Sequence, residues 1–191
     1  MINDSEKSKI AIALLIIILG AIGRFFLVEY VRIPNFEMIT ALALTAGMYL
    51  GGIYAMVIPV SIVFLSDIVI GNSSIIIFTW TAFAIIGLFG TSFRNNSHNI
   101  KLGQSMLIAT LSTIFFYIYT NFGWWLMSGM YAHSLSGLID CYVMALPFFK
   151  NQLIGNMIFV PIAIFSAKHA SKLMKEKSFL ALKQLLKFKN N

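Results

Sequence analysis

Long apolar runs constrain the fold of this chain more than any other feature of its sequence. Six such runs occupy residues 10–28, 37–50, 53–70, 75–89, 102–126 and 151–167. About 20 apolar residues in a helix cross the hydrocarbon core of a bilayer. Only 11% of the residues are charged and 59% are hydrophobic, whereas about a quarter of the residues of a soluble domain are charged. The sequence therefore predicts an all-α integral membrane protein with about six transmembrane helices.

Polar segments divide the chain into one membrane domain and two tails. Residues 1–9 predict a short cytoplasmic tail, and residues 10–167 a single six-helix membrane domain. Residues 168–191 are rich in lysine and leucine and predict a basic amphipathic helix on the membrane surface. Residues 134–146 are apolar but too short to span, and Pro147 follows them. They therefore predict a re-entrant or interfacial helix.

The distribution of Lys and Arg predicts the orientation. With six spans, eleven of the 14 basic residues fall on the side of the two termini, and only Arg24, Arg32 and Lys150 fall on the other. Basic loops remain in the cytoplasm, so we expect a protein of the bacterial cytoplasmic (inner) membrane with cytoplasmic N- and C-termini. Residues 120–156 then face outward. Basic residues beside a span indicate the lipid bilayer as a partner, and no nucleic acid is expected.

This orientation gathers polar and aromatic side chains at the outer face. Polar groups near hydrocarbon are unfavourable unless paired, so they usually face a cavity, a partner or a ligand. Aromatic surface with a few convergent polar groups is typical of a small-molecule site. The candidate ligand-binding residues are Asn35, Asp67, Trp80, Asn121, Trp124, Tyr131, His133, Tyr142 and Asn156.

These residues also have structural interpretations. Trp and Tyr concentrate at membrane interfaces without any ligand. Asp67 precedes a Gly-Asn turn and is equally suited to a helix end. Asn121 and Asn156 can form hydrogen bonds between helices, and His133 can simply be solvated. Arg24, late in the first apolar run, either extends to the interface or binds an anion.

The sequence lacks the motifs of common enzymes and metal sites. It contains no HExxH, CxxC or GxSxG motif and no Gly-rich phosphate loop. His98 and His169 are predicted on the opposite side of the membrane from His133, which argues against a zinc site. Cys141 is the only cysteine and is interpreted as a small apolar filler, with a redox or ligating role as the alternative. We therefore expect no catalytic residues, no cofactor and no metal.

Two blocks of sequence carry a resemblance to known proteins. The first, residues 34–71, contains PNF, ALALTAGMYLGG and VIPVSIVFLSDIVIG; the second, residues 120–156, contains TNFGWWLMSGMYAHSLSGLIDCYVMALPFF and NQLIGN. Over about residues 34–165 the chain resembles an uncharacterised family of small bacterial membrane proteins, a domain of unknown function. That family is similar in size and layout to the substrate-binding S components of energy-coupling factor (ECF) vitamin transporters.

The resemblance implies an S-component-like six-helix bundle that captures a micronutrient near the outer face. It also implies a scaffold subunit and two ATPases as partners. The matching motif positions are Asn35, Asp67, Asn121, Trp124, Tyr131 and Tyr142. The first helix lacks the Ala-xxx-Ala spacing that S components often use for docking to the scaffold. Gly47 and Gly51 are therefore predicted as a substitute helix-packing face, and a solitary carrier is the alternative.

We thus expect a substrate-binding membrane subunit or small transporter for a vitamin-like micronutrient, with the ligand in an outward-facing aromatic and polar pocket. One alternative is a membrane scaffold or assembly protein without a small-molecule substrate. Another is an intramembrane enzyme that uses Asp67, Asp140 or His133.

Overall fold

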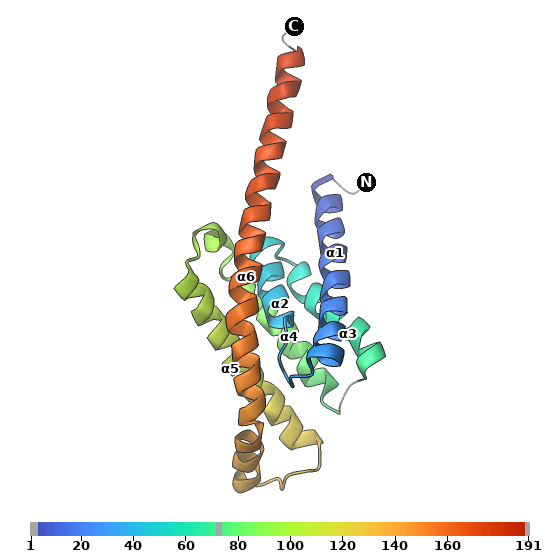
Figure 1. Ribbon diagram of the computed structural model, residues 1–191, viewed down its shortest axis with the longest axis vertical. Helices are drawn as coiled ribbons and strands as arrows, with labels where there is room; N and C mark the ends of the chain where they lie inside the picture. The colour runs from blue at the N-terminus through green and yellow to red at the C-terminus, as the bar shows by residue number, and fades with distance from the viewer. Residues whose placement is uncertain (1–3, 72–73, 190–191) are drawn as a thin grey trace.

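The computed structural model describes residues 4–71 and 74–189, with side chains over residues 6–71 and 74–173. The described residues form helices and short connections, and no strand (Figure 1). The elements are α1 (Asp4–Phe26), η1 (Leu27–Val31), α2 (Ile39–Tyr49), α3 (Tyr54–Ile70), α4 (Ile76–Thr91), η2 (Arg94–Asn99), α5 (Leu102–Met127) and α6 (Leu135–Lys189). The predicted all-α class is confirmed.

The bundle has two distinct ends. The start of α1, the end of α6 and the η2 connection lie toward the upper end in Figure 1, which we call the terminal end. The connections 32–38 and 128–134 lie toward the opposite end, which we call the loop end.

Three of the six main helices are long and apolar enough to cross a membrane. The stretches that qualify are Glu6–Val31, Leu102–Met127 and Leu135–Leu173. The apolar helices α2, α3 and α4 have 11, 17 and 16 residues. At 1.5 Å per residue, α2 extends about 17 Å, well short of a hydrocarbon core of about 30 Å. Membrane-type helices are thus found, but not six helices of full spanning length. The tail predicted over residues 1–9 is helical from Asp4 onward.

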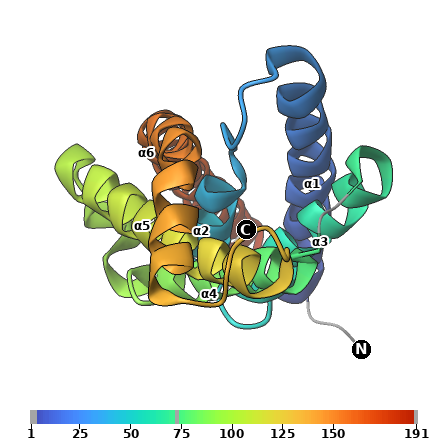
Figure 2. The same ribbon diagram turned by 90° about the horizontal axis from the view of Figure 1, so that it is seen from below.

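The short helix α2 is the centre of the bundle. Nine of its 11 residues are buried, and it contacts α1, α3, α4, α5 and α6. Viewed from the end, it lies between α6 on one side and α1 on the other (Figure 2). Its small residues permit this position. A Cβ added at Gly47 would lie 2.1 Å from the carbonyl oxygen of Gly87 on α4, so the two backbones pass at a distance that only glycine allows.

Gly51 does not share a helix face with Gly47. It follows the end of α2 with a φ of +64°, and its N–H donates to the carbonyl of Ala46 at 2.9 Å. This is a glycine in the left-handed conformation that commonly terminates a helix. The helix-packing prediction therefore holds for Gly47, against α4, and not for Gly51. Both glycines are buried, so neither lies on a surface open to a scaffold.

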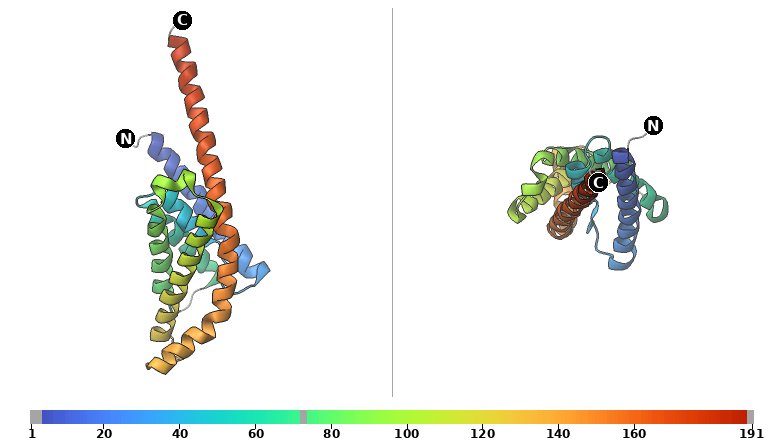
Figure 3. Two further views of the ribbon diagram at one scale, coloured as in Figure 1. Left: turned by 90° about the vertical axis from the view of Figure 1, so that its left-hand side faces the viewer. Right: turned by 90° about the horizontal axis from the view of Figure 1, so that it is seen from above.

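The C-terminal part of the chain is one continuous helix. α6 passes through Pro147 and Pro161 without interruption. The helices predicted over residues 134–146 and 168–191 are thus found over the described residues 135–146 and 168–189, but their separation from the last span is wrong, because all three belong to α6. A proline removes one backbone hydrogen bond and bends a helix, but no turn sequence follows it here to end the helix. The first turns of α6 lean away from the axis of the remainder (Figure 3).

Candidate functional site

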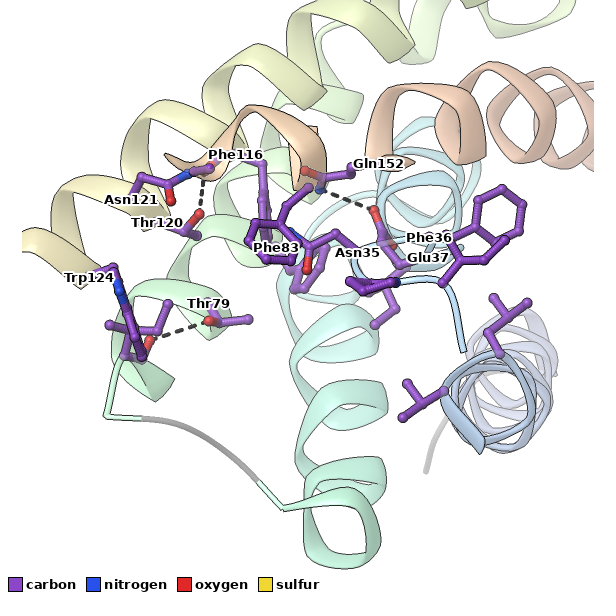
Figure 4. Close-up of a pocket in the computed structure, with 18 of the residues that line it drawn as sticks. Asn35, Phe36, Glu37, Thr79, Phe83, Phe116, Thr120, Asn121, Trp124 and Gln152 are labelled. Carbon is purple, nitrogen blue, oxygen red and sulfur yellow. Dashed lines mark hydrogen bonds between the residues drawn. The ribbon is translucent and has the colours of Figure 1, made fainter. Parts of the chain in front are cut away.

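An open cavity of about 680 Å³ lies at the loop end of the bundle (Figure 4). Its walls come from the end of α1, η1, the connection 32–38, α4, α5, the connection 128–134 and α6. Small-ligand sites typically measure about 300 to 1,000 Å³ and combine apolar walls with a few polar groups. The cavity has this size and this mixture of side chains.

Two residues in the left-handed conformation shape the connection 32–38. Arg32 has a φ of +55° and ends the π-helical turn η1, its N–H donating to the carbonyl of Leu27 at 3.0 Å. Asn35 has a φ of +59°, a conformation that asparagine tolerates better than most residues. The chain therefore turns sharply twice before it enters α2.

The same connection is held against α6. The Asn151 side chain donates a hydrogen bond to the carbonyl of Pro34 at 3.0 Å. The ring of Phe36 packs edge-on against Phe159, with centroids 5.4 Å apart. These contacts keep the connection in place as one wall of the cavity.

Glu37 links this wall to α2 and α6. Its carboxylate accepts hydrogen bonds from the backbone N–H of Thr40 at 3.0 Å and from the Thr40 hydroxyl at 2.5 Å. It also accepts a longer one, at 3.4 Å, from the Gln152 amide, as Figure 4 shows. Loss of hydration raises the pKa of the Glu37 carboxyl, and these hydrogen bonds act in the opposite direction. Glu37 thus caps α2 and places a carboxyl group in the cavity wall.

One face of α5 forms a second wall. Phe116, Thr120, Asn121 and Trp124 line the cavity, and their spacing places them on one side of a helix. The Thr120 hydroxyl donates to the carbonyl of Phe116 at 2.8 Å, and the Asn121 amide donates to the carbonyl of Tyr117 at 2.7 Å. The carbonyl oxygen of the Asn121 side chain therefore remains as an acceptor.

One face of α6 forms a third wall. Cys141, Met144, Ala145, Phe148 and Gln152 line the cavity from this helix. Cys141 is buried, and its thiol lies 3.5 Å from the carbonyl oxygen of Asn121. This agrees with its interpretation as a small packing residue.

In addition to the Asn121 oxygen, three polar groups of the cavity have no protein partner within the described parts of the chain. They are the indole N–H of Trp124, the hydroxyl of Tyr131 and the side-chain amide of Asn35. Each can donate a hydrogen bond, and two can also accept one. A bound molecule can satisfy these groups without displacing an existing protein contact.

Arg24, at the end of α1, lies at the edge of the cavity and turns inward. Its guanidinium pairs with the Asp67 carboxylate, donates to the Ser66 hydroxyl and lies 3.5 Å from the carbonyl of Val63. Asp67 also accepts a hydrogen bond from the indole of Trp80 at 2.9 Å. Neither simple interpretation of Arg24, extension to the interface or an unpaired anion site, matches this arrangement.

The cavity contains four of the nine residues predicted to bind ligand. These are Asn35, Asn121, Trp124 and Tyr131. Asp67 and Trp80 do not line it, because they bond to each other and to Arg24 between α1, α3 and α4.

The other three predicted residues also lie outside the cavity. His133 is exposed and packs its ring against Trp125, with centroids 5.2 Å apart. The hydroxyl of Tyr142 donates to the carbonyl of Ile118 at 2.8 Å, which joins α6 to α5. Asn156 is fully buried and donates to the Thr113 hydroxyl at 2.8 Å. The interhelical interpretation of this amide is therefore the correct one.

The predicted set lacks several polar residues of the cavity, among them Arg24, Glu37 and Gln152. Each is an ionisable or amide side chain beside or within an apolar run, and such residues are by default candidates for function. That rule alone would have included them.

The side chains proposed for an intramembrane enzyme do not converge. None of Asp67, Asp140 and His133 lines the cavity, and Asp140 is exposed on α6. Among the described residues, no three His, Cys, Asp or Glu side chains are placed to hold a metal ion. The arrangement is suited to binding by aromatic contact and hydrogen bonds.

Comparison with known proteins identifies the family of this chain. No curated protein and no solved structure matches the chain. The family of unknown function DUF6580 matches residues 4–179. These residues include every helix that forms the cavity, and the chain therefore belongs to this family of unknown function.

Proposed function

We propose that this chain is a substrate-binding membrane subunit or small transporter that captures a vitamin-like micronutrient at the loop end. The observation that supports this proposal is the cavity of about 680 Å³ with indole, phenol and amide groups that no other residue of the described chain engages. A protein that served only as a membrane scaffold would have no need to leave these groups without partners around an open space.

The chemistry of the walls indicates the kind of ligand. Phe36, Phe83, Phe116 and Trp124 offer aromatic surface, which favours a flat ring system. Trp124, Tyr131 and Asn35 supply the polar contacts that orient it. A planar heterocycle with hydrogen-bonding groups on its edge, as in many vitamins, fits this combination.

The proposed orientation follows from the basic residues. Seven lysines lie between Lys168 and Lys189, near the terminal end, and such segments remain in the cytoplasm. The cavity at the loop end then opens to the outside of the bacterial cytoplasmic membrane. In this proposal all six helices belong to an S-component-like bundle, which binds its ligand without chemical turnover. It then works either with a scaffold and ATPases or alone, and a docking surface for a scaffold would lie outside α2.

Native mass spectrometry of the full chain, purified in mild detergent, tests the proposal. We expect a small molecule to copurify and to be lost in Trp124→Ala. Phe122→Ala is the matched control, because Phe122 lies on the same helix, is exposed and does not line the cavity.

Retention of the bound mass in Trp124→Ala, or its loss in both variants, would contradict a site in this cavity. A ligand-free protein that no member of a vitamin panel stabilises against heat would favour the scaffold function instead.

A further inference from the structure

A second open cavity, of about 500 Å³, lies between η2 and α6 toward the terminal end. It is lined by His98, Phe165, Lys168, His169 and Lys172. Four of the five carry nitrogen groups that can donate hydrogen bonds, and two of these are lysines. None of the five lines the larger cavity, so this is a separate site.

Helical spacing brings the α6 residues together. Phe165, Lys168, His169 and Lys172 follow one another at intervals of three, one and three residues, which places them on one face of the helix. This face is turned toward η2, from which His98 completes the cavity.

Tyr49, at the end of α2, contacts both η2 and α6 and fixes their positions relative to each other. Its hydroxyl lies 3.2 Å from the carbonyl oxygen of Ser97 on η2 and 3.3 Å from that of Ile164 on α6. Its ring packs edge-on against His98, with centroids 6.0 Å apart. Lys168 lies one helical turn beyond Ile164, so the same contact fixes the position of the first lysine relative to His98.

The cavity joins a cationic part to an apolar one. Ile162 and Phe165 are 58% and 37% exposed, and they lie one to two turns before the lysines on the apolar part of α6. The ammonium group of Lys168 is 6.0 Å from the centroid of the Phe165 ring. An amphiphile can therefore place an anionic group among the nitrogen atoms and an acyl chain along the adjacent apolar surface.

The surrounding charge favours an anion. Residues 168–191 contain seven lysines and a single acidic residue, Glu176. Clusters of Lys and Arg directly beside a membrane helix attract anionic lipid headgroups. A phosphate oxyanion could come from such a lipid or from a soluble phosphate ester, but only the lipid also uses the apolar surface of Ile162 and Phe165.

We propose that this second cavity binds the phosphate group of an anionic phospholipid, with Lys168 and Lys172 as cationic contacts and His98 and His169 as further hydrogen-bond donors. The bound lipid would connect η2 to α6 at the membrane surface. This site is independent of the micronutrient function proposed above.

Native mass spectrometry of the delipidated full chain, titrated with phosphatidylglycerol or phosphatidylcholine, tests this inference. We expect one phosphatidylglycerol to bind preferentially, and the double variant K168Q/K172Q to weaken its binding about tenfold or more. The matched control K101Q/K150Q removes the same charge at two exposed lysines outside both cavities and should bind as the wild type does. His98→Asn tests the contribution of η2 and should also weaken binding.

If both double variants bind phosphatidylglycerol equally weakly, or if His98→Asn binds it as well as the wild type does, the lipid is held by diffuse charge attraction and the proposed site is wrong. If an equal concentration of glycerol phosphate displaces phosphatidylglycerol, the ligand of the second cavity is a soluble phosphate ester and not a lipid. Unchanged thermal unfolding of each variant in lipid-free detergent shows that a loss of binding is not a loss of fold.

Discussion

Arg24 of α1 and Asp67 of α3 form an ion pair between their helices, with side chains 19% and 5% exposed. The indole of Trp80 on α4 donates to the same carboxylate. The Asp67 carboxylate therefore links α1, α3 and α4 beside the larger cavity. This arrangement explains why an aspartate and an arginine are tolerated next to apolar runs, since buried charges persist in proteins when they are paired.

The first prediction concerns this ion pair. Asp67→Asn leaves the guanidinium of Arg24 without a counter-ion, and removing one partner of a buried pair typically lowers the free energy of unfolding by about 3 kcal/mol. The double variant R24Q/D67N removes both charges and should be more stable than the sum of the two single effects implies. Chemical denaturation in mixed micelles measures the free energy of unfolding of the wild type, the two single variants and the double variant.

Lys9→Gln, in the exposed pair of Lys9 with Glu6, is the control, and its free energy of unfolding should change little. Additive single effects would show that the two charges do not interact.

The second prediction concerns the crossing of the central helices. A Cβ added at Gly87 would lie 1.8 Å from the carbonyl oxygen of Ala55, so Gly87→Ala forces two backbones apart. We expect the free energy of unfolding to fall by at least about 3 kcal/mol, or the protein not to fold. Gly103→Ala is the matched control, because no atom lies within 4 Å of its added Cβ, and it should be neutral or more stable by up to about 1 kcal/mol. Thermal unfolding in detergent compares them, and similar midpoints would contradict the close approach.

The third prediction concerns pH. Loss of hydration raises the pKa of Glu37 above its ordinary value of 4.5, so the folded state holds this proton more tightly than the unfolded state does. The resulting contribution to stability is complete below pH 4.5 and is lost as the pH rises through the pKa of the folded state. Glu37→Gln should therefore flatten the decline of unfolding free energy with rising pH. Parallel stability curves for the wild type and this variant would show that Glu37 does not contribute.

The fourth prediction separates backbone from side chain at Asn35. Its φ of +59° is unfavourable for alanine by about 1 kcal/mol and readily adopted by glycine. Asn35→Ala should lower the free energy of unfolding by about this amount, and Asn35→Gly should retain stability while removing the amide from the cavity. Thermal unfolding measures the first effect, and retention of the copurified molecule measures the second. Full ligand retention in Asn35→Gly would exclude the amide from binding.

The order and approximate limits of the helices could be predicted from the apolar runs. The run at 102–126 corresponds to α5 over Leu102–Met127, and the run at 53–70 to α3 over Tyr54–Ile70. The prediction was wrong in the C-terminal third, where Pro147 was interpreted as a helix end. A proline favours the end of a helix, but no turn sequence follows Pro147, and the buried residues Cys141, Ala145 and Gln152 hold α6 against the bundle on both sides of it.

The cavity could be predicted only in part. The residue types found in binding sites identified Asn35, Asn121, Trp124 and Tyr131. The same reasoning from residue type also assigned Asp67 to the ligand site, although Asp67 pairs with Arg24, which lies 43 residues away in the sequence. The pairing of Glu37 with Gln152 spans 115 residues, and no local pattern indicates it.

The sequence by itself determined that this chain forms apolar helices and where most of them begin and end, because hydrophobicity and turn residues act locally along the chain. Only the tertiary structure decided which polar groups pair with one another and which remain open to a cavity. The physical reason is that helices such as α4, apolar on all sides, carry no periodic signal of their inward face. Their rotation is set by close contacts such as that between Gly47 and Gly87, and this rotation assigns every polar side chain its neighbours.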